Sequence, residues 1–402
     1  MREKGSLEAL NEKDWQVIHL STGHEGGAGL AARRLNSALN QHGVNSSFGA
    51  LQNPSYILGD NEFSISRTLF QRLLSGLIVR SQRLLTKKVL FSLKSLNVYK
   101  FKRIQKLGSP GSTILHFHNW YNLVNQKEII KLSKKGYSVI VTLHDERFFT
   151  GGCHYAFECE KFKTDCRACP ELFPIIDLLP AKNITHTIKW LPNSNLTFIA
   201  PSQWLKEEAL SSRLLKNQKV VFIPNTLGIP IESASSPRDK SEESHSVIRI
   251  GIASMDTSSY IKGGDITSEI EAEIASNFLQ IEMIYLSQIE AQNSKEEFWD
   301  KIDYLLVASR AENSPNVIHE AKHFGVPVIA SDVGGISELL HEDFDIVIPK
   351  SEINAGKILE LIEGLRRIDN ARDTASMRES FKQYVGGSAE SHKNLYLSLV
   401  NN

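Results

Sequence analysis

Two glutamates in the last third of the chain, Glu312 and Glu320, have the type and spacing to bind a polar ligand. Between them the sequence predicts the start of a helix, whose first backbone N–H groups, those of Asn316 and Val317, have no acceptor within the helix. The partial positive charge at a helix start favours a phosphate or another anion. The carboxylates flank this anion site at different depths, so one can accept hydrogen bonds from sugar hydroxyls and the other from a ribose.

The local sequence explains why a helix is expected at that point. A predicted strand, Tyr304–Ala308, runs into the loop that carries Glu312. Ser314 is a good N-cap residue, Pro315 suits the first helical position, and Gly325 suits the end of the helix. The alternative is a solvated helix whose glutamates lie at the surface and bind nothing.

A glycine-rich turn follows the first predicted strand. Gly26, Gly27 and Gly29 lie between that strand and a helix, where glycine permits a tight turn and a close approach of the backbone to a ligand. A plain strand-to-helix turn would use the same residues, so this signal alone does not separate the two interpretations.

Histidines stand at the ends of two predicted strands. His116 and His118 end one strand, and His144, followed by Asp145, ends another. Histidines in such places are more often structural than catalytic. Ligands, however, bind beyond the carboxyl ends of parallel strands, which makes His118 and His144 candidate site residues. Asp145 can orient its neighbour His144.

The four cysteines of the chain all lie within one short segment. Cys166 and Cys169 have the spacing of a zinc knuckle, whereas Cys153 and Cys159 are spaced more loosely, and His154 could replace a thiolate. A structural zinc ion is the first interpretation. Unligated packing cysteines are the second, and disulfides or a redox pair are the third, disfavoured in a reducing cytosol.

The elements that position these residues follow an alternating pattern. Short apolar runs rich in β-branched residues alternate with amphipathic stretches, which predicts an α/β fold with mostly parallel sheets. Residues 232–246 are polar and are expected to link an N-terminal and a C-terminal series of strands. The predicted strands are Trp15–Leu20, Thr113–Phe117, Ser138–Leu143, Thr197–Ala200 and Lys219–Ile223, then Val247–Ala253, Ile281–Ser287, Tyr304–Ala308, Val326–Ala330 and Ile346–Ile348.

Composition excludes several classes of protein. The 402 residues include 46 basic and 46 acidic side chains, and this neutral balance disfavours bulk nucleic-acid binding as the main activity. No run approaches the ~18 apolar residues that span a bilayer. Residues 1–14 are polar and charged and show no secretory signal, so a cytoplasmic location is expected.

Positive charge is concentrated in residues 63–106, which contain eleven Lys or Arg residues and no Asp or Glu. Apolar residues recur at helical spacing from Leu69 to Ile78, which predicts a basic amphipathic helix. Such a helix can lie on an anionic membrane surface. Alternatively, its apolar face packs on its own domain and its basic face is solvated.

The stretch from Glu312 to Gly335 resembles the signature of retaining glycosyltransferases, in which seven residues separate two glutamates. More narrowly, it is similar to glycosyltransferase family 4, whose members have the GT-B fold of two facing Rossmann-like domains with a cleft between them. The resemblance implies that Glu312 contacts the hydroxyls of the donor sugar and Glu320 the nucleotide ribose. It also implies that the helix start at Asn316 and Val317 holds the diphosphate.

Other parts of the chain resemble the same family. Gly26 and Gly27 are similar to the Gly-Gly loop that covers the donor diphosphate and the acceptor. His144 matches a histidine motif that lines the donor site, and the resemblance places His118 and Asp145 on the acceptor side.

Lys262, followed by Gly263, resembles the Lys-Gly motif whose lysine pairs with the diphosphate. A plain surface lysine is the alternative. Together with Glu312 and His144, Lys262 is a candidate catalytic residue. The sequence departs from the family after the preceding strand, where most members carry a second phosphate-binding arginine and this chain has Ser254. Either Lys262 and the helix dipole suffice, or turnover is weakened.

The cysteine segment and the histidine motifs together resemble a subgroup of the family, the transferases of the colanic-acid and exopolysaccharide type. This implies a retaining, metal-independent hexosyltransferase that uses a nucleotide-diphosphate sugar and a glycan acceptor, expected to be lipid-linked, at the inner face of the cytoplasmic membrane. The alternatives are a nucleotide-sugar epimerase or phosphorylase, or a degenerate transferase that binds a membrane or a partner.

The predicted domains follow from the strands and from the resemblance. Residues 1–226 are expected to form an acceptor-side Rossmann-like domain, with a cysteine-rich insertion at 151–170. Residues 227–372 are expected to bind the nucleotide sugar, and 373–402 to return as a C-terminal helix to the first domain.

Overall fold

The computed structural model describes residues 15–85, 91–92, 101–227, 247–254, 256–277, 279–289, 295–365 and 374–400. These residues fall into two compact units, one of residues 1–228 with 387–402 and the other of residues 229–386. The polar segment 232–246, predicted as a linker, lies outside the described residues. No helix in the described part of the chain is long and apolar enough to cross a membrane.

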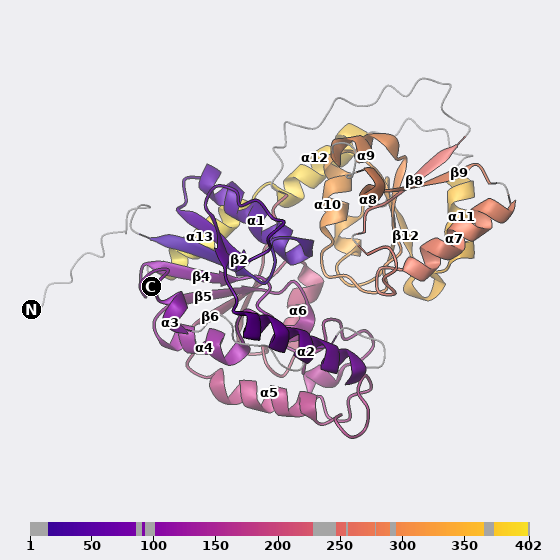
Figure 1. Cartoon of the computed structure of the whole chain (residues 1–402). Coiled ribbons are helices and arrows are strands. Elements are labelled where there is room, and N and C mark those ends of the chain that lie inside the picture. Colours follow the sequence, from indigo (N-terminus) through magenta and orange to yellow (C-terminus); the bar gives the residue numbers. More distant parts are fainter. Residues whose placement is uncertain are drawn as a thin grey trace, which may run out of the picture. The chain divides into compact units, whose positions relative to one another are not determined.

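The first unit is built on a parallel sheet that has seven strands in the described residues, in the order β3-β2-β1-β4-β5-β6-β7 (Figure 1). The order reverses between β1 and β4, so the carboxyl ends of these two strands border the crevice where such sheets bind ligands. The strands are β1 Gln16–Ser21, β2 Ser46–Leu51, β3 Glu62–Ile65, β4 Thr113–Phe117, β5 Ser138–Thr142, β6 Leu196–Ala200 and β7 Lys219–Phe222.

Helices cover both faces of this sheet. One face packs residues of the first and last helices, among them Leu35, Leu39 and the fully buried Tyr396. The other face packs a larger aromatic and aliphatic core around Phe117 and Phe198. The helices are α1 Gly26–Gln41, α2 Leu69–Leu85, α3 Phe101–Ile104, α4 Gln126–Lys134, α5 Leu179–Trp190, α6 Gln203–Ser211 and α13 Ser388–Val400.

The second unit is a smaller α/β unit with a parallel sheet of order β12-β11-β10-β8-β9 in the described residues. Its strand order reverses between β8 and β10. The strands are β8 Ile248–Ile252, β9 Ile281–Tyr285, β10 Tyr304–Val307, β11 Val328–Ser331 and β12 Ile346–Ile348. The helices are α7 Gly264–Asn277, α8 Leu286–Ile289, α9 Lys295–Lys301, α10 Asn316–His323, α11 Ala355–Leu365 and α12 Thr374–Val385.

The C-terminal segment is two helices rather than one. α12 belongs to the second unit, where Arg378 donates to the carbonyl of Phe324 at 3.0 Å. The chain then turns at Gly386, and α13 belongs to the first unit, where Ser388 Oγ donates to the carbonyl of Pro224 at 2.6 Å. The segment that joins the first unit therefore begins at residue 387, not at the predicted 373.

All ten predicted strands are present, with ends that shift by one or two residues. Two strands were not predicted, β2 and β3. The sequence of β2 begins with two serines and contains a glycine, which does not favour a strand. The glycine is required, because a Cβ at Gly49 would lie 2.3 Å from the ring of Phe63 in β3. The contact that makes these segments strands is therefore a tertiary one, which local propensity does not show.

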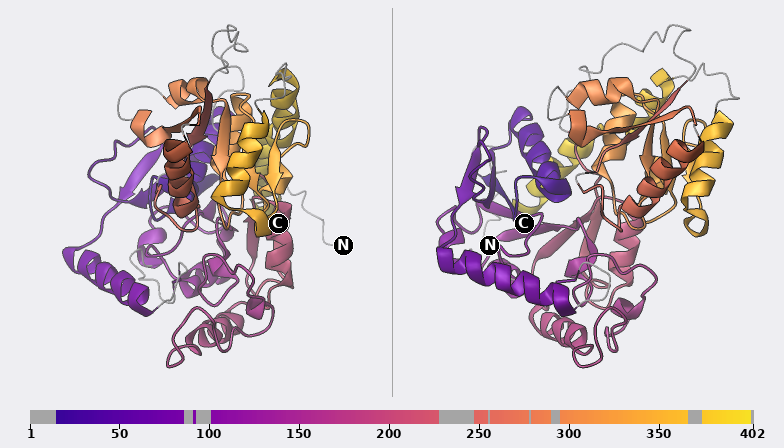
Figure 2. Two further views of the ribbon diagram at one scale, coloured as in Figure 1. Left: turned by 90° about the vertical axis from the view of Figure 1, so that its right-hand side faces the viewer. Right: turned by 45° about the vertical axis from the view of Figure 1, so that its right-hand side comes forward.

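Helix α2 exposes most of its apolar face. Leu69, Phe70, Leu73, Leu77 and Leu84 are 73, 72, 62, 63 and 79% exposed. At 100° per residue these positions fall in one stripe of the helix. Figure 2 shows α2 along the outer side of the first unit. The interpretation in which the apolar face packs on its own domain is therefore wrong for this stripe.

Candidate functional site

The second unit brings two predicted site residues together at the carboxyl edge of its sheet. Lys262 lies in the loop after β8, and Glu312 lies in the loop after the neighbouring strand β10. This is where the strand order reverses, the place where open α/β sheets bind ligands. The Nζ of Lys262 lies 2.5 Å from Oε1 of Glu312, although 50 positions separate the two residues in sequence.

The carboxylate of Glu312 is buried and well supplied with donors. Its side chain is 8% exposed, whereas that of Lys262 is 36% exposed. Ser309 Oγ also donates to Oε1 of Glu312, at 3.0 Å. A buried carboxylate is costly unless it is paired in this way. Glu320 is 1% exposed, so the interpretation of both acids as solvated surface glutamates is wrong.

Arg310 was not predicted from the sequence as a site residue, yet it holds the loop that carries Lys262. Its guanidinium binds the carboxylate of Asp265 through two contacts of 2.6 and 2.8 Å and lies 4.0 Å from the ring centroid of Tyr260. Its backbone N–H donates to the carbonyl of Ile261 at 2.7 Å. Because Asp265 balances its charge, we do not assign to Arg310 the role of the phosphate-binding arginine that most family members carry after β8 and that this chain lacks. The sequence feature that could have identified Arg310 is its position two residues before Glu312, in the loop after β10.

Gly263 lets the same loop pass against the end of β10. Its φ is +77°, in the left-handed region, and a Cβ there would lie 2.2 Å from the carbonyl oxygen of Ala308. A larger residue would push the loop away from β10 and move Lys262 with it.

The helix start between the two glutamates lies one residue later than predicted. α10 begins at Asn316, with Pro315 in an extended conformation as the N-cap and no side-chain cap. Ser314, the predicted cap, instead hydrogen bonds His319 Nε2 at 3.2 Å. The proline has no N–H to donate, so leaving it outside the helix costs no hydrogen bond. Val317 is the second residue of α10, and Glu320 lies one turn further on.

In the first unit, Gly26 and Gly27 open helix α1 directly after the β1 loop. Gly26 has φ +75°, and a Cβ at either glycine would meet nothing within 4 Å, so there is open space beside the helix start. Gly29 is different, since a Cβ there would lie 2.5 Å from the carbonyl oxygen of Gly23. Gly29 therefore serves the close packing of the turn, whereas Gly26 and Gly27 border open space.

The strand-end histidines form a chain of ring contacts. His118 Nε2 lies 3.0 Å from His19 Nδ1, and His118 Nδ1 lies 3.0 Å from His144 Nε2. The ring of His116 lies beside that of His118, with centroids 4.1 Å apart, and its nitrogens contact Tyr396 Oη at 2.8 Å and Thr142 Oγ1 at 2.7 Å. His116 thus links β4 to β5 and α13 and has a structural role.

Burial keeps these rings neutral. It lowers the pKa of His144 to about 4 and that of His19 to about 3, and it lowers the pKa of His118 well below its usual value. His144 therefore offers a ligand a neutral hydrogen-bonding ring rather than a positive charge. A metal ion such as zinc needs three or more His, Cys, Asp or Glu ligand atoms close together. In the described residues, only His19, His116 and His118 place such atoms within 4.8 Å of one another.

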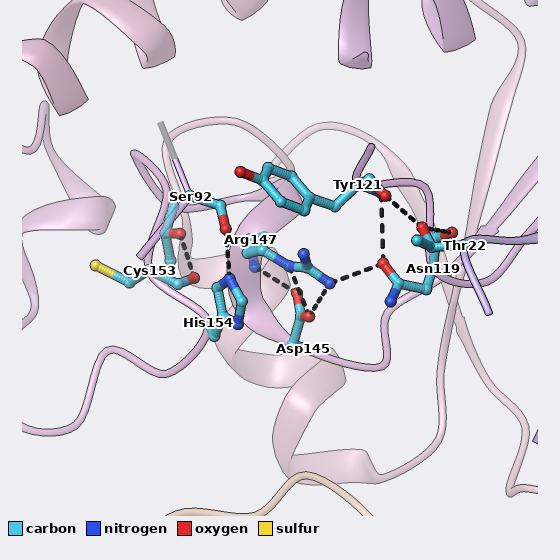
Figure 3. Close-up of polar contacts among 9 residues, drawn as sticks. Thr22, Ser92, Asn119, Tyr121, Asp145, Arg147, Cys153 and His154 are labelled. Carbon is cyan, nitrogen blue, oxygen red and sulfur yellow. Dashed lines mark hydrogen bonds and ion pairs between the residues drawn. The ribbon is translucent and has the colours of Figure 1, made fainter. Parts of the chain in front are cut away.

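Asp145 holds an arginine that was not predicted from the sequence (Figure 3). Arg147 donates to the carboxylate of Asp145 through Nε at 2.7 Å, and through Nη2 to Asn119 Oδ1 at 3.0 Å. Burial alone would raise the pKa of Asp145, but the positive charge of Arg147 outweighs it and lowers that pKa. Asn119 also accepts from Thr22 Oγ1 at 2.9 Å through its carbonyl, which connects this network to the loop before Gly26.

Glu146 anchors the cysteine segment to the end of β5. Its Oε2 accepts from the backbone N–H of Ala156 at 2.7 Å, and its own N–H donates to the carbonyl of His154 at 3.0 Å. Burial raises the pKa of Glu146 to about 8, so this carboxyl is protonated at neutral pH.

Substitution Glu146→Gln is expected to flatten the pH dependence of stability. Between the unfolded pKa of about 4.5 and the folded pKa of about 8, unfolding releases the proton of Glu146. The free energy of unfolding therefore falls by up to ~1.4 kcal/mol per pH unit as the pH rises. Glutamine keeps the acceptor for Ala156 and cannot ionise. Urea unfolding from pH 5 to 8 tests this, with the exposed Glu207→Gln as the control, and an unchanged slope would contradict it.

The four cysteines are thiols rather than disulfides, and three of them are buried. Cys153 hydrogen bonds the sulfur of Cys169, which lowers the pKa of Cys169 to about 7. Burial raises the pKa of Cys166 to about 11. Four sulfurs around zinc would lie about 3.8 Å apart, given Zn–S bonds of about 2.3 Å. In the described residues the cysteines do not form a group of three sulfurs within 4.8 Å, so zinc binding would require them to move closer.

Comparison with known proteins identifies part of the chain by sequence and most of it by fold. Residues 249–364 match the family model of glycosyl transferases group 1. A protein of Escherichia coli K12, provisionally assigned as the colanic acid biosynthesis glycosyl transferase WcaC, is 25% identical over 272 residues. That match covers 61% of this chain and 66% of the relative, just under two thirds of its length.

Solved structures resemble nearly the whole chain. Sucrose-phosphate synthase of Thermosynechococcus elongatus has a TM-score of 0.57 at 16% identity and covers 96% of this chain and 99% of its own. Anabaena HepE in complex with UDP has a TM-score of 0.54 at 14% identity and covers 95% and 100%. At these identities the likeness shows the fold alone. The predicted GT-B fold class, with two Rossmann-like domains, is confirmed.

Proposed function

We propose that this chain, whose residues 249–364 match the family model of the group 1 glycosyl transferases, is a retaining glycosyltransferase. It moves a hexose from a nucleotide-diphosphate sugar to a glycan acceptor in the synthesis of a surface polysaccharide. The observation that carries the proposal is the contact between Lys262 and the buried Glu312 where the strand order reverses, within the segment that matches the family. The similarity to HepE, solved with UDP, and to WcaC supports a nucleotide sugar and a glycan as substrates.

The donor is proposed to bind mainly to the second unit. Glu312 accepts hydrogen bonds from the sugar hydroxyls and Glu320 from the ribose. Lys262 and the start of α10, at Asn316 and Val317, hold the diphosphate. Lys262 already lies beside Glu312, so one lysine can contact the diphosphate while Glu312 binds the adjoining sugar.

Catalysis is proposed to come from stabilising the leaving diphosphate. Negative charge grows on that group as the bond to the sugar breaks, and Lys262 and the helix dipole are placed to stabilise it. The positive charge of these groups allows the reaction to proceed without a divalent ion or a protein nucleophile. The resemblance of the stretch from Glu312 to Gly335 to the family signature supports our proposal that the protein belongs to glycosyltransferase family 4.

For the first unit, the family resemblance assigns Gly26, Gly27 and His144 to donor binding and His118 and Asp145 to the acceptor side. The open space beside Gly26 and Gly27 gives the diphosphate room near a helix start. Neutral His144 donates or accepts a hydrogen bond near the donor sugar, while His118 and Asp145 act on the acceptor side. The contact between His118 and His144 lets the acceptor-side ring fix the orientation of the donor-side ring.

The test is a donor screen followed by product analysis. UDP-, GDP- and ADP-hexoses are each added, and binding is read from the rise in melting temperature. The donor that binds is then incubated with and without lipid-linked oligosaccharide.

We expect nucleotide release that requires the acceptor, with an α-linked product from an α-linked donor. An epimer formed without acceptor would favour the epimerase alternative, and sugar phosphate formed with phosphate would favour a phosphorylase. Absence of both binding and turnover would favour a degenerate transferase.

The acceptor is proposed to be lipid-linked, with the protein bound to the inner face of the cytoplasmic membrane through α2. The apolar stripe of α2 is exposed, and the exposed Arg72 and Arg80 lie beside and within it. This pattern suits an interfacial helix on anionic lipid.

Vesicle binding should depend on the apolar stripe of α2. The protein is expected to sediment with vesicles of phosphatidylglycerol and phosphatidylcholine at low salt, and less at high salt. Replacing Leu73 and Leu77 together by Ser is expected to weaken binding by about tenfold or more, because each leucine loses its transfer from water to lipid. Ile57→Ser removes a residue that is 90% exposed outside α2 and serves as the control. Equal sedimentation of all three proteins would contradict membrane binding through α2.

Zinc in the cysteine segment stays a prediction. Metal analysis of protein purified without chelator is expected to give one zinc per chain, and the content should fall in Cys166→Ser and Cys169→Ser. Ser211→Ala, outside the segment, is the control. Zinc-free protein with four titratable thiols would favour packing cysteines.

A further inference from the structure

The first unit contains a cavity of about 540 Å³ that none of the predicted site residues lines. Most of its lining residues come from α4 and α5, two helices that contact each other, and from the loop that follows β5. The cavity is large enough for a sugar ring and is open to solvent at one side.

The lining of this cavity is cationic and aromatic. Its basic side chains are those of Lys127, Arg147 and Lys189, and no carboxylate is among the lining residues in the described part of the chain. Trp120 and Trp190 add ring surfaces, and the Nζ of Lys127 lies 4.1 Å from the ring centroid of Trp190. Because Asp145 balances the charge of Arg147, the net positive charge comes from the two lysines.

The walls of the cavity are tied together by polar side chains. Gln126 Nε2 donates to the carbonyl of Phe148 at 2.9 Å, and Thr187 Oγ1 donates to Gln126 Oε1 at 2.9 Å. Asn183 Nδ2 donates to the carbonyl of Gly151 at 3.0 Å. These bonds connect both helices to the loop after β5, so the cavity is already formed before any ligand binds.

A continuous network joins the cavity to the loop before Gly26. Arg147, in the cavity wall, donates to Asn119, and Thr22 donates to the carbonyls of Asn119 and Tyr121 (Figure 3). Hydrogen bonds therefore connect the cavity wall to the loop that precedes Gly26 within the same unit.

We infer that this cavity binds an acidic sugar, a hexuronic acid residue of the acceptor glycan. This rests on the proposed function and specifies its acceptor. The two lysines attract the carboxylate, the indole rings offer apolar surface to the sugar ring, and the amide and hydroxyl groups contact its hydroxyls. An isolated phosphate would use the lysines and leave the indole surfaces without a partner, so the lining favours the acidic sugar.

The test is binding of small probes to the full chain, which requires no transfer reaction. Methyl β-D-glucuronide and methyl β-D-galacturonide are compared with methyl β-D-glucoside and with inorganic phosphate, by titration followed through tryptophan fluorescence and by saturation-transfer NMR. We expect at least one uronide to bind about tenfold more tightly than the glucoside. Lys127→Gln and Lys189→Gln should each weaken it about three- to tenfold, as for a partly exposed ion pair.

The control is Lys182→Gln, which changes an exposed lysine of α5 that does not line the cavity. This variant should bind the uronide as tightly as the wild-type protein does. Equal binding of glucoside and uronide would overturn the inference, as would uronide binding unaffected by both lysine substitutions. Phosphate that displaces the uronide at equal concentration would assign the cavity to a phosphate group. If nucleotide sugar binds and uronide does not, the inference fails and the proposed function stands. If uronide binds and no nucleotide sugar does, the proposed function fails.

Discussion

Substitution Glu312→Gln is expected to lower turnover by about 10²–10³-fold while the protein stays folded and still binds nucleotide. Glutamine has the shape of glutamate and keeps one acceptor oxygen, but it has no charge to hold the sugar hydroxyls or to pair with Lys262. Ser309 Oγ can still donate to the remaining oxygen. The side chain of Lys262 is 36% exposed, so water can solvate its charge once the pair is broken. The loss should therefore appear in turnover, not in stability.

The measurement is the initial rate of sugar transfer, together with the affinity for UDP or whichever nucleotide the donor screen selects. Glu342→Gln, an exposed acid of the same unit, is the matched control and should leave both quantities unchanged. A turnover within threefold of the wild type would remove Glu312 from the site. A large loss of nucleotide affinity would instead indicate that Glu312 acts by holding Lys262 in place for the diphosphate, because a carboxylate does not itself bind an anionic diphosphate.

A second measurement compares the Lys262→Gln variant with Glu312→Gln. Lys262→Gln removes the charge proposed to bind the diphosphate, so it should weaken nucleotide binding, which Glu312→Gln should spare. The double variant separates the two roles, since groups that act on one another give non-additive losses. A sum of two independent losses would indicate that the contact seen between them has no part in the reaction.

The loops that carry the site could be predicted because their residues have local signatures. Glu312, Glu320 and the start of α10 lie within one short stretch, and the strand, loop and helix are visible in its apolar pattern. The first residue of α10 was predicted one position too early. Proline has no N–H to donate, so Pro315 fits equally well as the residue before the helix and as its first residue. This one-residue error does not change which N–H groups come first in the helix. Because proline has no N–H, they are those of Asn316 and Val317 in either case.

Long-range contacts could not be predicted in the same way. The contact of Lys262 with Glu312 depends on β8 and β10 being neighbours, which is a property of the sheet and not of either loop. The role of Arg310 depends on the same neighbourhood, because both of its partners follow β8 in the chain, Tyr260 in the loop and Asp265 in the first turn of α7. In the first unit, the pairing of Arg147 with Asp145 is local, but its connection to Asn119 again needs the order of the strands.

The second large effect concerns the buried ion pair that anchors α10. The side chains of Lys322 and Asp345 are 3% and 0% exposed, and Lys322 Nζ contacts Asp345 Oδ2. Asp345 also accepts from the backbone N–H groups of Val328 and His341, at 2.8 and 2.7 Å. One carboxylate thus ties the helix of the site to the start of β11 and to the turn before β12.

Asp345→Ala is expected to destabilise the second unit by about 3–5 kcal/mol, because it leaves a buried lysine without its partner. Burial already lowers the pKa of Lys322, with Asp345 opposing that effect, so the variant should be somewhat less unstable at high pH, where the lysine can lose its proton. Hydrogen exchange of peptides from β10 to β12 measures the change in this unit. Lys357→Met, at a partly exposed ion pair with Glu360, is the control and should cost little.

The double variant Lys322→Met with Asp345→Asn decides whether the effect comes from the unpaired charge. Methionine removes the buried charge, and asparagine keeps an acceptor for one of the two N–H groups, so much of the lost stability should return. A double variant as unstable as Asp345→Ala would mean that the backbone hydrogen bonds of Asp345 carry the effect instead. Because α10 bears Glu320 and the helix start, Asp345→Ala should lose activity and stability together. Glu312→Gln should lose activity alone, and this difference separates a residue that supports the site from one that acts in it.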